Sequence, residues 1–163
     1  MAAPLPDQGA IVAAKYGIAR SPRWPAVEKV HLASQPQCVC CEPGQSPTAG
    51  LQVHHIFPFH YCIALGRPDL ELDPRNLITL CEDEDGRQGQ DHHLLVGHLD
   101  DFESSNLQVV TDAENTFLGM EAAAIRADAT WKAKVAARLK PLGEMTAPDK
   151  DQFVAEMNAR FPR

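Results

Sequence analysis

Side chains that bind metal ions and transfer protons are concentrated in the middle of this chain. They are two histidine pairs and three cysteines, namely His54-His55, His92-His93, Cys38, Cys41 and Cys81. Neighbouring residues of a strand point to opposite faces. One histidine of a pair on a strand can therefore bind a metal while the other faces a substrate. This arrangement favours a metal-dependent hydrolase.

The spacing of the cysteines indicates a zinc site. Cys38 and Cys41 have two residues between them and a Pro-Gly turn after them, which is typical of a knuckle that presents two sulfurs to one tetrahedral zinc ion. Cys81 and His92 can complete a Cys3His set. Two alternatives stay open from the residues alone. Cys40 replaces Cys41 if the turn is wound differently, or the clustered cysteines are buried small hydrophobes.

Two short β-prone segments carry the first histidine pair and the third cysteine. Residues 51–56 are predicted to form a strand that Pro58 stops, and residues 76–80 a second strand. A polar loop over residues 59–75 joins them. A loop of this length allows antiparallel pairing, which would bring Cys81 back towards the cysteine knuckle.

The second histidine pair opens a predicted helix over residues 91–98, with Asp91 as its N-cap. On an α-helix His93 and His98 do not share a face. We therefore expect that they do not bind one metal ion together, as two histidines four residues apart would. The acidic stretch over residues 82–86 is predicted to be a solvated loop, because it does not match the spacing of a calcium-binding loop.

The remaining segments are predicted to be an arm and three helices. A helix begins at residues 21–25 and ends before Pro36, an Ala-rich apolar stripe predicts one long helix over residues 111–139, and a last helix covers residues 148–161. The predicted organisation has three parts: a flexible arm over residues 1–20, a domain over residues 21–107 and a helical extension over residues 108–163.

Length and composition are typical of one soluble globular domain. The chain has 163 residues, of which 44% are hydrophobic and 23% charged. No apolar run is long enough to span a bilayer, and the N-terminus lacks the basic start and apolar stretch of a signal peptide. We therefore expect a cytoplasmic protein that has no membrane partner and no structural disulfides.

The net charge of −7 argues against a protein that coats nucleic acid non-specifically, because neutralisation of phosphates by Lys and Arg dominates such binding. The charge is unevenly distributed, however. The first 37 residues and residues 130–140 are basic, whereas residues 69–103 contain half of the acidic residues. A polyanion could therefore be bound by the basic flanks.

Four segments together resemble the HNH endonucleases, in a form common in phage and bacterial genomes. They are Cys38-x-x-Cys41, Val53-His54-His55-Ile56-x-Pro58, Asn76-Leu77-Ile78-Thr79-Leu80-Cys81 and His92-His93. The resemblance covers roughly residues 20–107. It implies an α+β fold with a small ββα-metal core and a structural zinc knuckle, flanked by an N-terminal helix and C-terminal helices.

The resemblance also implies a function, a metal-dependent DNA endonuclease that hydrolyses phosphodiester bonds. His55 would be the general base, Asn76 would orient it, and His54 with His93 would hold one Mg²⁺ or Mn²⁺ ion. The structural zinc would be bound by Cys38, Cys41, Cys81 and His92. The predicted DNA contacts are Arg20, Arg23, Lys29 and His98. The implied partners are DNA and, from the phage setting, packaging proteins.

Family members usually have a cysteine immediately before the final histidine, and His92 occupies that position here. The zinc and catalytic roles of His92 and His93 are therefore partly interchangeable at the level of sequence. Two other functions stay open. One is a non-catalytic, zinc-stabilised module that binds nucleic acid or protein, and the other is a small hydrolase that acts on RNA.

Overall fold

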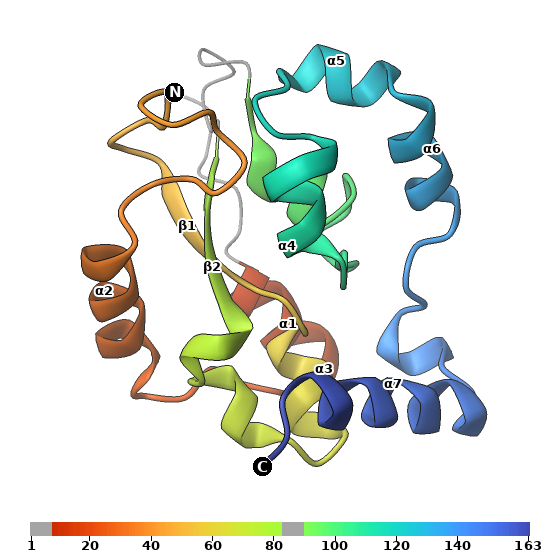
Figure 1. Ribbon diagram of the computed structural model, residues 1–163. Helices are drawn as coiled ribbons and strands as arrows, with labels where there is room; N and C mark the ends of the chain where they lie inside the picture. The colour runs from red at the N-terminus through yellow and green to blue at the C-terminus, as the bar shows by residue number, and fades with distance from the viewer. Residues whose placement is uncertain (1–7, 83–89) are drawn as a thin grey trace.

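Two antiparallel strands lie at the centre of the molecule, with helices arranged around them (Figure 1). The computed structural model describes residues 8–82 and 90–163. β1 (Leu51–His55) pairs with β2 (Leu77–Cys81), in a register that sets the first residue of β1 opposite the last residue of β2. The predicted antiparallel pairing is confirmed, and the chain has an α+β fold.

The helices are mostly short, and several are 3₁₀- or π-helices. The α-helices are α1 (Gln8–Tyr16), α2 (Trp24–Ser34), α3 (Phe59–Ala64), α4 (Val109–Thr111), α5 (Ala122–Ala127), α6 (Ala129–Ala136) and α7 (Ala147–Arg160). The 3₁₀-helices are η1 (Pro68–Glu71), η2 (Pro74–Asn76) and η5 (Leu142–Glu144), and the π-helices are η3 (His93–Gly97) and η4 (Asp112–Thr116).

The two faces of the sheet are covered by different elements. On one face Trp24 of α2 packs against Val53 and Leu77 in a small apolar cluster. On the other face Leu80 belongs to the main core together with Leu95 of η3. Because side chains alternate along β1, this arrangement separates the surroundings of consecutive strand residues.

Within the arm predicted over residues 1–20, residues 8–16 form α1. Residues 1–7 lie outside the described part of the chain. Val12 is buried, and the Lys15 ammonium pairs with the Glu103 carboxylate at 2.9 Å, so α1 has both an apolar and a charged attachment. The prediction of a polar loop over residues 59–75 is wrong. This segment contains α3 and η1, and Tyr61 and Leu70 in these helices are fully buried in the core.

The long helix predicted over residues 111–139 is broken in two places. Gly119 has a φ of +72°, a left-handed conformation that glycine adopts at low cost. Asp128 is extended, and its carboxylate accepts a hydrogen bond from the Trp131 N–H at 2.9 Å, so that it ends α5 and caps α6. The last predicted helix is confirmed as α7, with Phe153 and Met157 buried.

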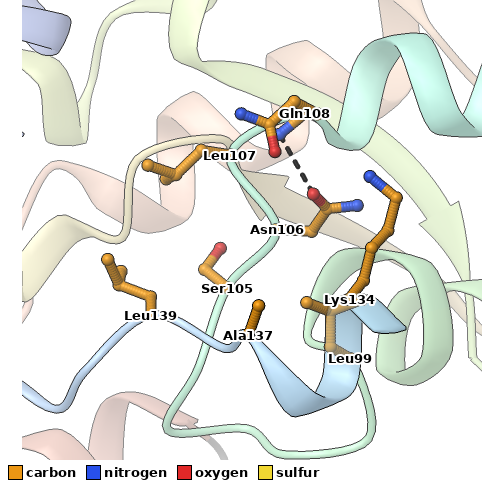
Figure 2. A pocket seen from close by; sticks show the side chains of 8 residues that line it. All are labelled: Leu99, Ser105, Asn106, Leu107, Gln108, Lys134, Ala137 and Leu139. Carbon is orange, nitrogen blue, oxygen red and sulfur yellow. Dashed lines mark hydrogen bonds between the residues drawn. The ribbon is translucent and has the colours of Figure 1, made fainter. Parts of the chain in front are cut away.

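A cavity of about 220 Å³ lies where α6 approaches the segment after η3 (Figure 2). Its walls are largely aliphatic, with Leu99, Leu107 and Leu139 on three sides. The Lys134 ammonium at its edge pairs with Asp112 at 3.0 Å. This cavity therefore offers little chemistry. Among residues 8–82 and 90–163, no helix combines the length and apolarity that crossing a bilayer requires.

Candidate metal centres

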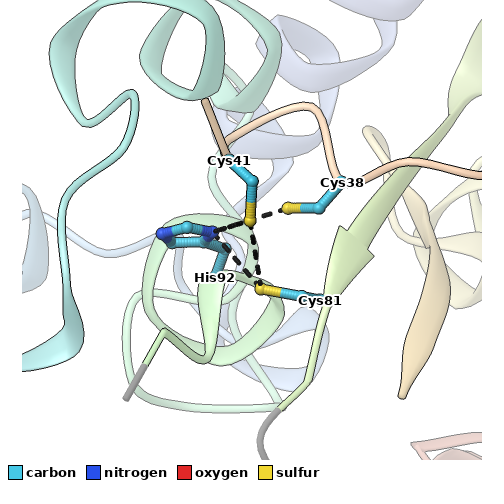
Figure 3. A group of neighbouring side chains, drawn as sticks. All are labelled: Cys38, Cys41, Cys81 and His92. Atoms are coloured by element: carbon cyan, nitrogen blue, oxygen red, sulfur yellow. Dashed lines mark hydrogen bonds between the residues drawn. The ribbon is translucent and has the colours of Figure 1, made fainter. Parts of the chain in front are cut away.

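The four predicted zinc ligands, Cys38, Cys41, Cys81 and His92, form one buried cluster (Figure 3). The His92 Nδ1 atom lies 3.5 Å from the Cys38 sulfur, 3.6 Å from the Cys41 sulfur and 3.3 Å from the Cys81 sulfur. The Cys41 and Cys81 sulfurs are 4.0 Å apart. The cluster could therefore hold a metal ion such as zinc.

These separations fit a tetrahedral zinc ion. Zinc–sulfur bonds of about 2.3 Å and zinc–nitrogen bonds of about 2.0–2.1 Å at tetrahedral angles place two sulfurs about 3.8 Å apart, and a sulfur and a nitrogen about 3.6 Å apart. The donor set also fits, because three thiolates and an imidazole form a closed structural site with no open position.

Local backbone contacts hold each ligand in place. The Cys38 N–H donates to the Ser46 hydroxyl at 2.8 Å, and the Val39 N–H donates to the Thr79 carbonyl at 3.0 Å, which attaches the knuckle to β2. The His92 Nε2–H donates to the Met120 carbonyl at 2.7 Å. Such a bond fixes the ring so that Nδ1 faces the sulfurs. The turn at Gly119 brings this carbonyl to the cluster.

The other two cysteines point elsewhere. The Cys40 thiol donates to the Phe117 carbonyl at 3.4 Å, and the Cys62 thiol donates to the Phe57 carbonyl at 3.4 Å. The described geometry therefore favours Cys41 over Cys40 as the second sulfur of the knuckle. Burial raises the pKa of both thiols, to about 12 for Cys62, as expected for structural cysteines.

The hydrogen bonds among the three thiols favour ionisation of one of them and oppose ionisation of the other two. Hydrogen bonds from Cys41 and Cys81 hold the Cys38 pKa well below its ordinary value. The hydrogen bond to Cys38 raises the Cys41 pKa to about 12, and Cys81 is shifted in the same direction. A divalent cation stabilises several thiolates at once, so metal binding here must release protons.

A second group of potential ligands lies beside the first. The imidazoles of His54, His93 and His98 are buried, and one ring nitrogen from each lies within 4.8 Å of the others. The Nε2 atoms of His93 and His98 are 3.1 Å apart. Burial, together with neighbouring imidazoles, lowers the pKa values of His54 and His98 well below the ordinary value. These two imidazoles are therefore neutral, as metal ligands must be.

The expectation that His93 and His98 face apart is wrong, because the segment is a π-helix rather than an α-helix. The His98 N–H donates to the His93 carbonyl five residues earlier at 3.1 Å, so that residues i and i+5 come onto one side. Leu99 and Asp100 then have positive φ angles of 53° and 68° and end the helix. This uncommon backbone is concentrated directly beside the histidine centre.

Two of the three imidazoles are oriented by hydrogen bonds on their far side. The His98 Nδ1–H donates to the Ser104 carbonyl at 2.7 Å, and the His93 Nδ1 atom lies 3.2 Å from a Glu82 carboxylate oxygen. Both rings therefore turn Nε2 inward. The Nε2 atom of His54 is buried and has no hydrogen-bond partner among the residues that the structure describes. A metal ion would satisfy this group.

Gly97 leaves the space that the His54 ring occupies. A Cβ atom on Gly97 would lie 3.1 Å from the His54 Cε1 and Nδ1 atoms and 3.2 Å from the Leu80 Cδ1 atom. Gly97→Ala should therefore displace the imidazole and weaken divalent-ion binding at the histidines about tenfold or more, while zinc binding at the cysteines persists. Isothermal titration of the zinc-loaded protein measures this.

Gly143→Ala is the matched control, because a Cβ atom there meets nothing within 4 Å. Equal affinities of the two alanine variants for the second ion would contradict the steric role of Gly97.

His55 follows His54 on β1 and packs on the other face of the sheet. Its ring lies 4.6 Å from that of Trp24 and 5.9 Å from that of Phe59, centroid to centroid. The His55 Nε2–H donates to the Glu71 carbonyl at 2.8 Å, which leaves the Nδ1 lone pair as a proton acceptor. Burial and then the Arg20 charge lower the His55 pKa to about 3, so the free imidazole is neutral.

Asn76 joins the end of β1 to the start of β2. Its amide oxygen accepts a hydrogen bond from the Phe57 N–H at 2.8 Å, and its amide nitrogen donates to the Phe57 and Leu70 carbonyls, each at 3.0 Å. The fully buried side chain thus fixes the backbone just after His55, at Phe57, and ties it to Leu70.

The predicted DNA contacts occupy different environments. Arg23 and Lys29 are exposed. The Arg20 guanidinium lies over the rings of Trp24 at 4.6 Å and Phe59 at 4.3 Å, the same two rings that flank His55. His98 is 1% exposed and belongs to the histidine centre, so it is not available as a surface contact. The π-helix turns it inward.

Sequence reasoning missed the part that Glu82 and His98 play in the histidine centre. Glu82 is the first residue of the stretch predicted to be a solvated loop, but its carboxylate contacts His93. The rest of that stretch, residues 83–86, lies outside the described residues. The available signal for Glu82 was the alternation of side chains along a strand. Glu82 follows Cys81, so its side chain faces the side opposite to the Cys81 sulfur. In comparisons with protein-family models, curated proteins and solved structures, no match to this chain was found.

Proposed function

We propose that this protein is a metal-dependent endonuclease that hydrolyses phosphodiester bonds in DNA, and that β1, β2 and η3 form a ββα-metal core of the HNH type. The observation that carries the proposal is the convergence of three buried imidazoles, His54, His93 and His98, beside a second buried histidine on the same strand. A purely structural module has no need for a second, all-histidine centre beside its zinc cluster.

The donor set bears on the choice of ion. Imidazole nitrogens suit zinc, nickel, iron and copper, whereas magnesium prefers oxygen ligands and keeps several of its waters. Three imidazole ligands therefore favour a first-row transition ion over Mg²⁺. When bound, such an ion supplies electrostatic stabilisation of the phosphate charge and of the leaving oxygen.

His55 is proposed to accept the proton of the attacking water. The Glu71 carbonyl fixes its tautomer, and Trp24 fixes its ring, so the Nδ1 lone pair is held in one direction. A pKa of about 3 describes the free protein, in which burial and Arg20 oppose protonation. An approaching phosphate anion offsets the Arg20 charge and raises the His55 pKa towards the range that a general base requires.

Arg20 is proposed to contact the DNA phosphate beside the base. Its guanidinium lies over the rings of Trp24 and Phe59, an arrangement that holds a cation in place beside His55. Arg23, which precedes α2, and Lys29, which lies on it, are both exposed and would then contact neighbouring phosphates. Because the net charge is −7, DNA binding would depend on local groups of basic residues such as Arg20, Arg23 and Lys29.

Cleavage of supercoiled plasmid tests the proposal. Zinc-loaded protein is incubated with plasmid alone and with added Mg²⁺, Mn²⁺, Co²⁺ or Ni²⁺, and a structured RNA is assayed in parallel. Cleavage of the plasmid is expected with Mn²⁺ or a later ion and not in the presence of a chelator that leaves the cysteine site loaded. Binding of DNA without cleavage under every ion would instead support the non-catalytic module, and cleavage of RNA alone would support the RNA hydrolase.

A further inference from the structure

Glu82 stands at the point where the two metal centres meet. It follows Cys81, a ligand of the cysteine cluster, and its carboxylate oxygen lies 3.2 Å from the Nδ1 atom of His93. Both side chains are largely buried, with the His93 side chain 9% exposed and the Glu82 side chain 15% exposed. A carboxylate in such a position is costly to desolvate unless it is paired, so the contact with His93 is a defined interaction.

The backbone fixes the position of this carboxylate. The Glu82 N–H donates to the Gly50 carbonyl at 2.7 Å, which continues the ladder between the two strands by one pair. Gly50 has a φ of +70°, and a Cβ atom on it would lie only 2.8 Å from the Glu82 carbonyl oxygen. Glycine at this position therefore permits the close approach that extends the ladder to Glu82.

We infer that Glu82 is a positioning residue of the histidine centre, and that its carboxylate holds His93 with Nε2 facing the metal ion. The inference rests on the proposed divalent-ion site. A carboxylate beside Nδ1 keeps the proton on that nitrogen, which leaves the Nε2 lone pair free to bind the ion. The carboxylate also adds one negative charge, which attracts a cation.

The Ser104 carbonyl, a neutral acceptor, accepts the His98 Nδ1–H at 2.7 Å and thereby turns the His98 Nε2 atom towards the centre. The ligands at the two ends of η3, His93 and His98, are thus oriented in parallel ways, but only His93 has a charged partner. Removal of the charge without removal of the acceptor should therefore act on His93 alone. Glu82→Gln achieves this, because the glutamine carbonyl can still accept the Nδ1–H.

Cobalt titration tests the inference in zinc-loaded protein, in which the cysteine site is already filled. Glu82→Ala, which removes both the acceptor and the charge, should weaken Co²⁺ binding at the histidines about 10- to 100-fold, the usual effect of losing an outer partner of a histidine ligand, and Glu82→Gln, which keeps the acceptor, should cause a smaller loss. The change should appear in the visible d–d spectrum of the cobalt complex. Glu114→Gln removes an equal charge from an exposed site and should leave the titration unchanged.

A double-mutant cycle separates positioning from general damage. His93→Ala should lower Co²⁺ affinity, and adding Glu82→Gln to it should cause little further loss, because the two side chains act as one unit. Equal Co²⁺ affinity of the wild type and Glu82→Ala would overturn the inference. So would a fully additive double variant, or loss of zinc from Glu82→Gln. Cobalt binding in the wild type without DNA cleavage would contradict the proposed function and leave the role of Glu82 standing.

Discussion

Cys81→Ser is expected to abolish zinc binding and to unfold the protein under conditions in which the wild type is stable. Binding of a structural zinc ion contributes about 10–16 kcal/mol to folding in small zinc modules, whereas whole domains are stable by only about 5–15 kcal/mol. Cys81 also ends β2 and lies within 4.0 Å of Cys41, so its loss opens the cluster at its centre. Zinc content and the circular-dichroism melting curve measure the result.

Cys62→Ser is the matched control, because both thiols are buried, at 0% exposure for Cys62 and 1% for Cys81. A serine at position 62 can still donate to the Phe57 carbonyl that the thiol contacts. This variant should keep one zinc ion per chain and most of its stability. Retention of zinc by Cys81→Ser, or equal damage in both variants, would show that the cysteine cluster does not bind the ion as described.

His55→Ala is expected to lower the rate of DNA cleavage by roughly 10²–10⁴-fold, the usual contribution of a general base. Affinity for the second ion should change little, because His55 packs against Trp24 on the face of the sheet opposite His54. Single-turnover cleavage at saturating ion concentration measures the chemical step, and titration of the ion shows whether the histidine centre is intact.

His31→Ala controls for the loss of a buried imidazole. His31 and His55 are each 5% exposed, and burial lowers the pKa of both, but His31 lies on α2 and is not one of the three clustered imidazoles. Cleavage by His31→Ala should remain near the wild-type rate once the fraction of folded protein is matched. If both variants lose the same activity, or if His55→Ala cleaves normally, His55 is not the base.

Local geometry explains which parts of the site could be predicted from sequence. The two-residue spacing of Cys38 and Cys41 already implies that both sulfurs face one point, since the turn between them is short. The alternation of His54 and His55 follows from the period of a strand. Antiparallel return of β2 was predictable from the intervening loop, and it places Cys81 beside the knuckle.

The histidine centre was harder to predict because it depends on one residue of helical register. An α-helical period separates His93 from His98, whereas in the π-helix the His98 N–H also reaches the His93 carbonyl five residues earlier and the two side chains come together. The bond from the His98 ring to the Ser104 carbonyl, six residues later, then holds the side chain in this position. Neither contact is visible as a pattern of residue types, so sequence periodicity gave the wrong face.

The broken C-terminal helix is a different kind of error, because its signals were present in the sequence. Gly119 and Asp128 are residues that favour helix ends and caps over helix interiors. The apolar stripe that runs through them outweighed these signals in the prediction. In the structure the chain bends at both positions, and the first bend carries the carbonyl that orients His92.

The adjacency of the two centres has a thermodynamic consequence. One peptide bond joins Cys81 to Glu82 and another joins His92 to His93, so each centre takes a member of both dipeptides. An ion that orders Cys81 and His92 thereby also restricts Glu82 and His93, which follow them in the chain. Occupancy of the first site should raise affinity at the second, and linkage requires the reverse to hold by the same factor.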